Sequence, residues 1–156
     1  MGADHPKSGV LDQAITALCR GLGERLVAVV LYGSRARGEE SPASDWDLLV
    51  IAEGLPERSF QRHLFFKRLL PPGCCEAVSI LARTSKEFES YLPSLYLDIA
   101  LDGRILYDPK TYAGARFAKL QALIVESGLY RERRPAGDLW RWRKEPSVAW
   151  ALGWGK

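Results

Sequence analysis

Two aspartates separated by a single residue, Asp45 and Asp47, stand at the start of the apolar run 48–51. Side chains two apart on a strand point to the same face, and at about 3.3 Å rise per residue their Cα atoms lie roughly 6.6 Å apart. Both carboxylates could therefore bind one hard cation. Carboxylates at the head of a buried strand are costly unless a cation pairs with them, so the spacing favours a metal ion. Mg²⁺ suits the pair, because it accepts one or two carboxylates and completes its shell with water and phosphate oxygens.

A candidate phosphate-binding segment precedes the aspartates. The run 27–32 is apolar and β-branched, which predicts a buried strand, and Gly33 follows where the backbone must turn or let a ligand approach. Ser34 suits a helix N-cap, and the helix formers after it would direct backbone N–H groups toward a phosphate. Arg35 and Arg37 add two permanent cations whose forked donors match phosphate oxygens.

A simpler interpretation of the same segment involves no ligand. Gly38 is expected to end the short helix, and a polar loop leads from it into the second strand. Asp45 and Asp47 could then merely solvate the end of that strand while the arginines pair with Glu39 or Glu40. This interpretation would be preferred for an isolated pair of aspartates, whereas the glycine, serine and arginines in order before them favour a site.

Gly33 and Ser34, ten intervening residues and then Asp45-x-Asp47 resemble the signature of the DNA polymerase β-like nucleotidyltransferase superfamily. The fuller order Gly-Ser-Arg-Ala-Arg-Gly and Ser-Asp-x-Asp-Leu is similar to its small minimal nucleotidyltransferase branch. The resemblance covers 26–51 closely and the chain to about residue 108 loosely. It implies an α/β (α+β) fold with a mixed β-sheet flanked by helices. It also implies transfer of a nucleoside monophosphate from an NTP to a hydroxyl, with release of pyrophosphate.

The resemblance assigns roles to individual residues. Gly33 and Ser34 would bind the β- and γ-phosphates, and Asp45 and Asp47 would hold two Mg²⁺ ions. Active members carry a third carboxylate on a neighbouring strand, where it completes the metal site and helps to deprotonate the acceptor. Glu76 is the candidate for this third ligand.

The position of Glu76 leaves a second interpretation open. Glu76 precedes a predicted strand over 77–81, and it could instead be a strand-edge charge that faces solvent. Asp98 is a weaker candidate, because it falls within a predicted helix over 94–101. Without a third carboxylate, the chain would bind a nucleotide but transfer it slowly or not at all.

The expected substrate is ATP, with AMP as the transferred group, and the acceptor stays open between a protein hydroxyl, a small molecule and an RNA end. Minimal nucleotidyltransferases include antitoxin partners of helical HEPN proteins, some of which transfer AMP to a tyrosine of the toxin. Only a short tail follows Gly128, so a HEPN-type partner would be a separate chain. The competing hypothesis is a catalytically weak or inactive antitoxin-like module that binds a nucleotide and holds a partner protein. A basic RNA-binding protein is the third.

Composition is that of one ordinary domain. The chain has 156 residues, 47% of them hydrophobic, and no apolar run approaches the ~20 residues that cross a bilayer. Its start lacks an apolar segment after basic residues, which predicts a cytoplasmic protein without a secretory signal. The three cysteines have neither disulfide nor zinc spacing. The lack of asparagine is typical of a thermophile, and equally of a G+C-rich genome.

Helices and strands are expected to alternate through a nucleotidyltransferase domain over 1–128. Apolar residues at helical spacing predict an N-terminal helix over 11–22, and Thr84 with Glu87 forms a capping-box sequence that starts another helix. Two further helices are predicted over 59–70 and 112–128, and a strand is predicted over 105–107. This alternation indicates a layered α/β or α+β domain.

The segment 129–156 differs in character, because it interleaves basic residues with four of the five tryptophans. One interpretation is a platform that stacks bases and binds phosphates of RNA. The period-two pattern of 139–143 fits equally a strand that lays Trp140 and Trp142 on the domain or on a second copy of the chain. We favour packing or homodimer formation, because a net charge of +3 is too mild to demand a polyanionic partner.

Overall fold

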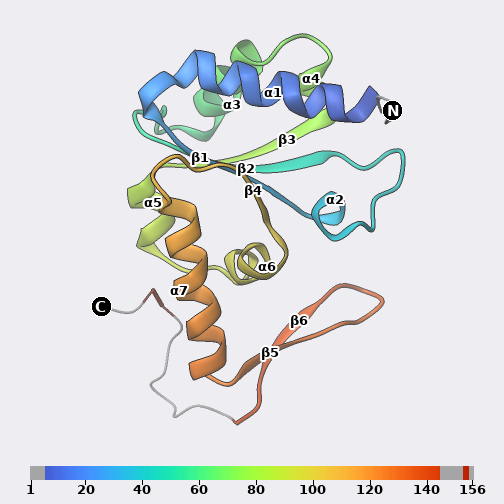
Figure 1. Cartoon of the computed structure of the whole chain (residues 1–156), viewed down its shortest axis with the longest axis vertical. Helices are drawn as coiled ribbons and strands as arrows, with labels where there is room; N and C mark the ends of the chain where they lie inside the picture. Colours follow the sequence, from blue (N-terminus) through green and yellow to red (C-terminus); the bar gives the residue numbers. More distant parts are fainter. Residues whose placement is uncertain (1–5, 145–152, 155–156) are drawn as a thin grey trace.

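The computed structural model describes residues 6–144 and 153–154 of the chain. Its main sheet is built from β1 (Leu26–Tyr32), β2 (Trp46–Ala52), β3 (Val78–Arg83) and β4 (Arg104–Tyr107). The strand order is β3-β2-β1-β4, with β1 antiparallel to both of its neighbours and β2 parallel to β3 (Figure 1). The predicted mixed sheet is therefore confirmed.

Helices cover both faces of this sheet (Figure 1). One face packs against α1 (Pro6–Leu22), α3 (Ser59–Leu69) and α4 (Cys74–Ala77). The other face packs against α5 (Ser85–Ser90), α6 (Ser94–Asp102) and α7 (Tyr112–Glu126). Within the described part of the chain, no helix combines the length and the apolar character that crossing a membrane requires.

The two central strands carry continuous apolar runs, 26–31 and 48–52, because both of their faces are covered there. Val29 and Val50 lie in the core beneath α1 and α3. Val30 and Leu49, their neighbours in sequence, lie in the core on the side of α6 and α7. All four side chains are fully buried, so the two continuous apolar runs correctly predicted buried strands.

The third strand begins later than the sequence predicted. A strand was expected over 77–81, but it begins at Val78, and the residues just before it form the single helical turn α4. Gly73 has φ of 91°, a left-handed conformation that turns the backbone into α4 after the two prolines. Glu76 therefore lies on a helical turn, and the alternation of side chains along β3 does not extend to it.

A second sheet follows α7. It is an antiparallel hairpin of β5 (Leu129–Glu132) and β6 (Leu139–Trp142). The extended segment predicted over 139–143 is confirmed as β6, and its partner strand β5 was not predicted. Trp140 and Trp142 are half-buried against the core on the α6 and α7 side.

Trp154 packs against the same core. Its indole N–H lies 3.1 Å from the Phe88 carbonyl oxygen, and its ring lies 5.1 Å from the Phe88 ring. Trp150 lies outside the described residues. The three described tryptophans of the tail thus contact the domain that precedes them. The domain boundary at residue 128 and the homodimer stay predictions.

Arg62 of α3 and Glu87 of α5 form a bidentate ion pair, with N–O distances of 2.7 and 2.8 Å. Glu87 also completes the predicted capping box, because its backbone N–H donates to the Thr84 hydroxyl at 3.1 Å. The hydrogen bonds from Arg62 hold the pKa of Glu87 below its ordinary value of 4.5. A carboxylate whose pKa is lower in the folded than in the unfolded protein stabilises the fold at a pH above its pKa in the unfolded state. This stabilisation is lost as the pH falls through its pKa in the folded state.

We expect Glu87→Gln to lower the free energy of unfolding by about 1 kcal/mol at pH 7, since solvent screens part of this half-exposed pair. The deficit should shrink as the pH falls below 4.5. Urea denaturation at pH 7 and at acid pH measures both quantities. The same change at the exposed Glu126 serves as the control. An equal deficit at both pH values would contradict the assigned ion pair.

Candidate active site

The end of β1 and the start of β2 meet at Gly33 and Asp47. The antiparallel register places Tyr32 opposite Asp47, so the chain leaves β1 directly beside this carboxylate. Gly33 has φ of 75° and ψ of −159°, a region open only to glycine. A Cβ atom at this position would lie 2.3 Å from Oδ2 of Asp47. The prediction that the backbone turns at Gly33 is confirmed, and the group that approaches closely there is the Asp47 side chain.

The helix predicted after Gly33 is the single turn α2 (Ser34–Arg37). Ser34 was expected to be its N-cap, but the cap is Gly33 and Ser34 is the first helical residue. The glycine conformation supplies the turn, so the Ser34 hydroxyl is not needed as the cap. Gly38 ends the helix with φ of 70°, as predicted, and its N–H donates to the Ser34 carbonyl.

The two arginines of α2 have different surroundings. The Arg35 side chain is buried, donates to the Ser44 carbonyl from Nε at 3.0 Å and from Nη2 at 2.7 Å, and stacks on Trp46. It therefore holds the loop that leads into the aspartates. The Arg37 side chain is more exposed, and its Nε lies 3.0 Å from Oε2 of Glu39.

The ionised carboxylate of Asp47 is destabilised by its surroundings. Burial raises the pKa of its carboxyl, the negative charge of Asp45 raises it further, and Arg37 lowers it in part. A divalent cation between two such carboxylates would remove this repulsion, and Mg²⁺ needs no more than one or two protein carboxylates. Asp45 and Asp47 therefore fit the predicted cation by charge and chemistry.

The described residues contain no group of three or more His, Cys, Asp and Glu side chains that could hold a metal ion. Asp45 and Asp47 lie together, while Glu76 is exposed on α4. The predicted role of Glu76 as a third ligand stays a prediction. Asp98 is already engaged, because it accepts hydrogen bonds from Arg131 and Trp140.

The register of β2 and β3 decides which residue lies beside Asp47. In this parallel pair Asp47 is the register partner of Ser79. Partners in register point to the same face of a sheet, so the exposed Ser79 lies on the Asp47 face. A serine thus occupies the position on the neighbouring strand where the resemblance implies a carboxylate. Sequence spacing alone did not reveal Ser79, because the register of a parallel pair depends on tertiary structure.

Two cavities border residues of the candidate site. The larger, of about 890 Å³, borders Asp45 and Glu76 and runs along β3 beside α3. The smaller, of about 430 Å³, borders Gly33 and Arg37. Asp45 thus lines the larger cavity, and Gly33, which lies against Asp47, lines the smaller one.

This sheet, with a glycine turn packed on one of two adjacent carboxylates, defines a nucleotidyltransferase fold. The sequence profile of the family described as "Nucleotidyltransferase domain" matches residues 11–121, well over half of the chain. The protein belongs to this nucleotidyltransferase family.

Individual relatives agree with that assignment. A protein of Methanocaldococcus jannaschii that carries the provisional name of a protein adenylyltransferase is 41% identical over 56 residues, which are 36% of this chain. The match spans only 38% of that relative's length. A crystal structure of a toxin-antitoxin with AMP-PNP is 17% identical and has a TM-score of 0.50, covering 78% of this chain and 92% of its own. At this identity the likeness concerns the fold alone.

We expect Gly33→Ala to abolish nucleotidyl transfer and to lower the free energy of unfolding by roughly 3 kcal/mol, from backbone strain and the displaced carboxylate. Gly38→Ala is the matched control, since Gly38 also has a positive φ but nothing lies within 4 Å of its added Cβ. The control should lose only about 1 kcal/mol and keep its activity. Denaturant titration and a transfer assay on both variants provide the comparison. Equal losses of activity and of stability in the two variants would contradict the assigned contact of Gly33 with Asp47.

Proposed function

We propose that this protein transfers AMP from ATP to the hydroxyl of a protein acceptor, in a reaction that requires Mg²⁺. The acceptor oxygen forms a bond to the α-phosphorus, the bond from that phosphorus to the β-phosphate bridge breaks, and pyrophosphate leaves. The hydroxyl proton passes to a nearby base or to water. The observation that carries the proposal is the close approach of Gly33 to Asp47, whose pKa the charge of Asp45 raises, with Asp45 and Gly33 each lining a cavity.

The donor would lie on the Gly33 side. Backbone N–H groups that follow a glycine turn suit phosphate oxygens, and Arg37 supplies a forked cation at the same cavity. Gly33, Ser34 and Arg37 would therefore hold the β- and γ-phosphates. Arg35 would act indirectly, by holding the loop at Ser44 that presents the aspartates.

Asp45 and Asp47 would hold Mg²⁺, which supplies neutralisation of charge on the reacting phosphates. In-line displacement requires the attacking and leaving oxygens on opposite sides of the phosphorus. Asp45 lines the larger cavity, and Gly33 and Arg37 line the smaller one, so acceptor and donor would occupy different cavities. The acceptor would then enter along β3, past Asp45 and Glu76.

The choice of a protein acceptor rests on the relatives. The Methanocaldococcus protein is named as a protein adenylyltransferase, and the structural neighbour is a toxin-antitoxin complex with an ATP analogue. By analogy, the acceptor would be a separate partner chain, for which a HEPN-type protein is our candidate. The larger cavity, of about 890 Å³ and lined by Asp45, would receive the acceptor side chain.

The direct test incubates the purified chain with each α-labelled NTP, with Mg²⁺ or with EDTA. Pyrophosphate release is scored together with label on the protein itself, on proteins of a cell extract and on total RNA. We expect release and protein labelling with ATP in Mg²⁺ only. Label on RNA would instead identify a nucleic-acid acceptor. NTP binding without release in any mixture would favour the non-catalytic binding module.

A further inference from the structure

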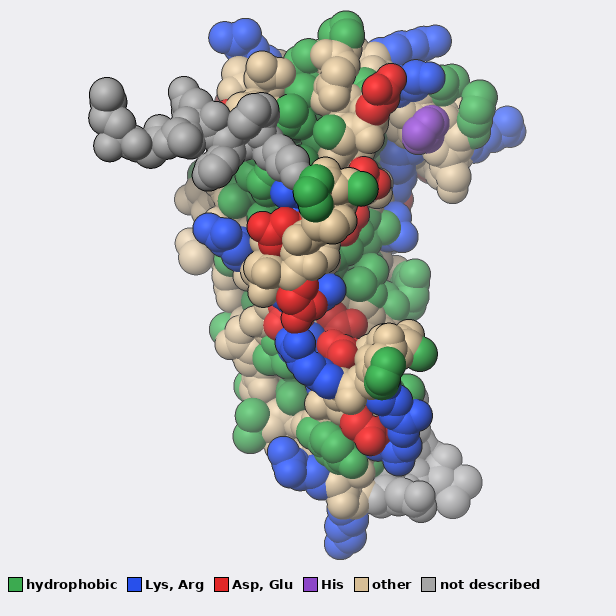
Figure 2. All heavy atoms as spheres, turned by 90° about the vertical axis from the view of Figure 1, so that its right-hand side faces the viewer, with side chains coloured by type: hydrophobic (Ala, Val, Ile, Leu, Met, Phe, Trp, Pro, Cys, Tyr) green, Lys and Arg blue, Asp and Glu red, His purple; other side chains and the backbone are tan. Residues whose placement is uncertain are grey.

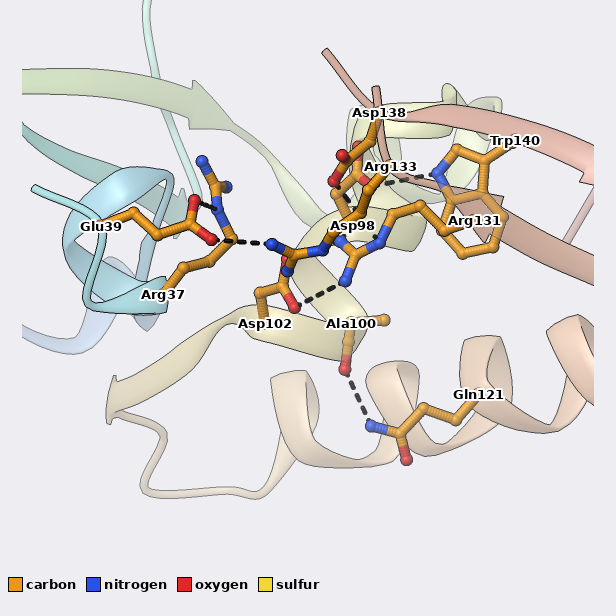
Figure 3. Close-up of polar contacts among 10 residues, drawn as sticks. All are labelled: Arg37, Glu39, Asp98, Ala100, Asp102, Gln121, Arg131, Arg133, Asp138 and Trp140. Atoms are coloured by element: carbon orange, nitrogen blue, oxygen red, sulfur yellow. Dashed lines mark hydrogen bonds and ion pairs between the residues drawn. The ribbon is translucent and has the colours of Figure 1, made fainter. Parts of the chain in front are cut away.

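The β5–β6 hairpin reaches the candidate nucleotide cavity from outside the family match. The matched region ends at residue 121, and the hairpin occupies 129–142. Its loop turns back toward α2, so segments far apart in the sequence meet there (Figures 1 and 3). Five residues of the loop border the cavity that Gly33 and Arg37 also line: Arg133, Arg134, Pro135, Gly137 and Asp138. The hairpin is thus one wall of that cavity.

The base of the hairpin is firmly anchored to α6. Arg131 is only 13% exposed and forms a bidentate pair with Asp102, at 2.5 and 2.9 Å. The same guanidinium lies 3.2 Å from Asp98, and the Trp140 indole donates to Asp98 at 3.0 Å (Figure 3). Asp138 lies 3.6 Å from Nε of Arg131. These contacts engage the acidic side chains on this wall and fix the position of the loop.

The tip of the hairpin is held by a single exposed carboxylate. Glu39 lies between Arg37 of α2 and Arg133 of the hairpin, with Nε–Oε2 and Nη1–Oε1 distances of 3.0 and 2.8 Å (Figure 3). Its hydrogen bond from Arg133, and then that from Arg37, hold the pKa of Glu39 below its ordinary value. The Arg133 side chain is 61% exposed, in contrast to Arg131. Acidic and basic side chains adjoin on this face of the molecule (Figure 2).

We propose that Arg133 is a nucleotide-binding residue that exchanges Glu39 for the terminal phosphates of the bound NTP. This inference rests on the proposed function. Glu39 bridges two forked guanidinium groups as a phosphate would, but a triphosphate offers more charge and more acceptor oxygens. The exchange needs only side-chain movement, because the base of the hairpin stays tied to α6. Glu39 then acts as an internal competitor of the NTP.

The alternative is that the Arg133–Glu39 pair simply fastens the hairpin. The two roles differ in their dependence on the ligand. A fastening pair would affect ATP and AMP alike, through the shape of the cavity. An arginine that binds terminal phosphates would affect ATP and spare AMP, which lacks them.

Calorimetric titration of the full chain with ATP and with AMP, in Mg²⁺, separates these roles. We expect Arg133→Gln to weaken ATP binding about tenfold and to leave AMP binding unchanged. Glu39→Gln should strengthen ATP binding about threefold at low salt, because a competing negative charge is gone. That gain should be smaller in the background of Arg133→Gln, because loss of Glu39 then releases Arg37 alone. Arg141→Gln is the matched control, since Arg141 pairs with Glu132 on the same hairpin and does not border the cavity.

Unchanged ATP affinity in Arg133→Gln and Glu39→Gln would overturn this proposal while leaving the proposed function intact. Equal losses for ATP and AMP would also overturn it, in favour of a fastening pair. A wild-type chain that binds no ATP would overturn both. ATP binding that responds as expected, without transfer to any acceptor, would support the role of Arg133 and count against the transferase.

Discussion

Replacing Asp45 and Asp47 together by asparagine is expected to reduce nucleotidyl transfer at least about 10³-fold, because the proposed Mg²⁺ would lose both of the carboxylates assigned to it. ATP binding through Gly33, Ser34 and the arginines should weaken much less. The measurement is pyrophosphate release beside calorimetric ATP binding, on wild type and double variant. Transfer that survives in the double variant would contradict the site.

The single substitution Asp47→Asn should have an effect on stability that a structural role of Asp47 would not produce. In the folded protein the pKa of Asp47 is raised by burial and by Asp45. A carboxyl whose pKa is higher in the folded than in the unfolded state destabilises the fold when it is ionised. The destabilisation develops as the pH rises from the pKa of the unfolded state through that of the folded state. Asp47→Asn removes a charge that the fold opposes at neutral pH. We therefore expect the variant, in EDTA, to be at least as stable as wild type at pH 7.

Urea denaturation in EDTA measures this effect, and any gain should fade as the pH drops below 3.8, the ordinary pKa of Asp47. Asp108 offers a matched control. Its carboxylate accepts from the backbone N–H groups of Ala113 and Gly114 at 3.1 and 2.9 Å, so it stabilises the start of α7. Asp108→Asn should destabilise the protein at pH 7. Destabilisation by Asp47→Asn of the same size would mean that Asp47 has a structural role.

Ser79→Asp is expected to increase transfer about tenfold at limiting Mg²⁺, because it adds a carboxylate beside Asp47 on the neighbouring strand. The exposed position accepts a charged side chain without repacking. A third carboxylate beside Asp45 and Asp47 adds repulsion when no cation is bound. The variant should therefore be less stable than wild type in EDTA and gain more thermal stability from Mg²⁺.

Two further variants decide between the candidates for the third position. Ser79→Asn keeps the size of the new side chain without its charge, and it should change neither activity nor the response to Mg²⁺. Glu76→Gln tests the carboxylate that the sequence favoured. If Glu76→Gln abolishes transfer while Ser79→Asp has no effect, Glu76 reaches the reacting phosphates from α4, and the assignment of Ser79 is wrong.

The core of the site could be predicted because it is local in sequence. Gly33, α2 and Asp45 lie in the single connection between β1 and β2, and Asp47 lies at the start of β2. Apolar runs and helical periodicity likewise predicted the helices and the central strands. The wrong predictions concern the ends of helices and strands, where the conformation of one residue sets the position at which the element begins. Gly33 replaced Ser34 as the cap, and Gly73 turned the residues before β3 into α4.

The tail could be predicted only in part. The period-two pattern around Trp140 and Trp142 correctly predicted a strand. Its partner strand β5 was missed, and the contact of Arg133 with Glu39 joins residues 94 positions apart. Nothing in the local pattern of either segment indicates this pairing. The sequence of the tail is basic and aromatic. In the described residues it forms a hairpin, and most arginines of this hairpin pair with carboxylates.

By itself, the sequence determined the family of the protein and predicted phosphate and metal binding, because these functions need particular side chains at short spacings that a strand-turn-strand unit preserves. It also determined most of the elements, since propensity and periodicity act over a few residues. Only the tertiary structure decided that Ser79 lies beside Asp47 and that the hairpin closes one side of the cavity. Strand register and long-range ion pairs depend on how whole elements pack, and that information is spread over the chain.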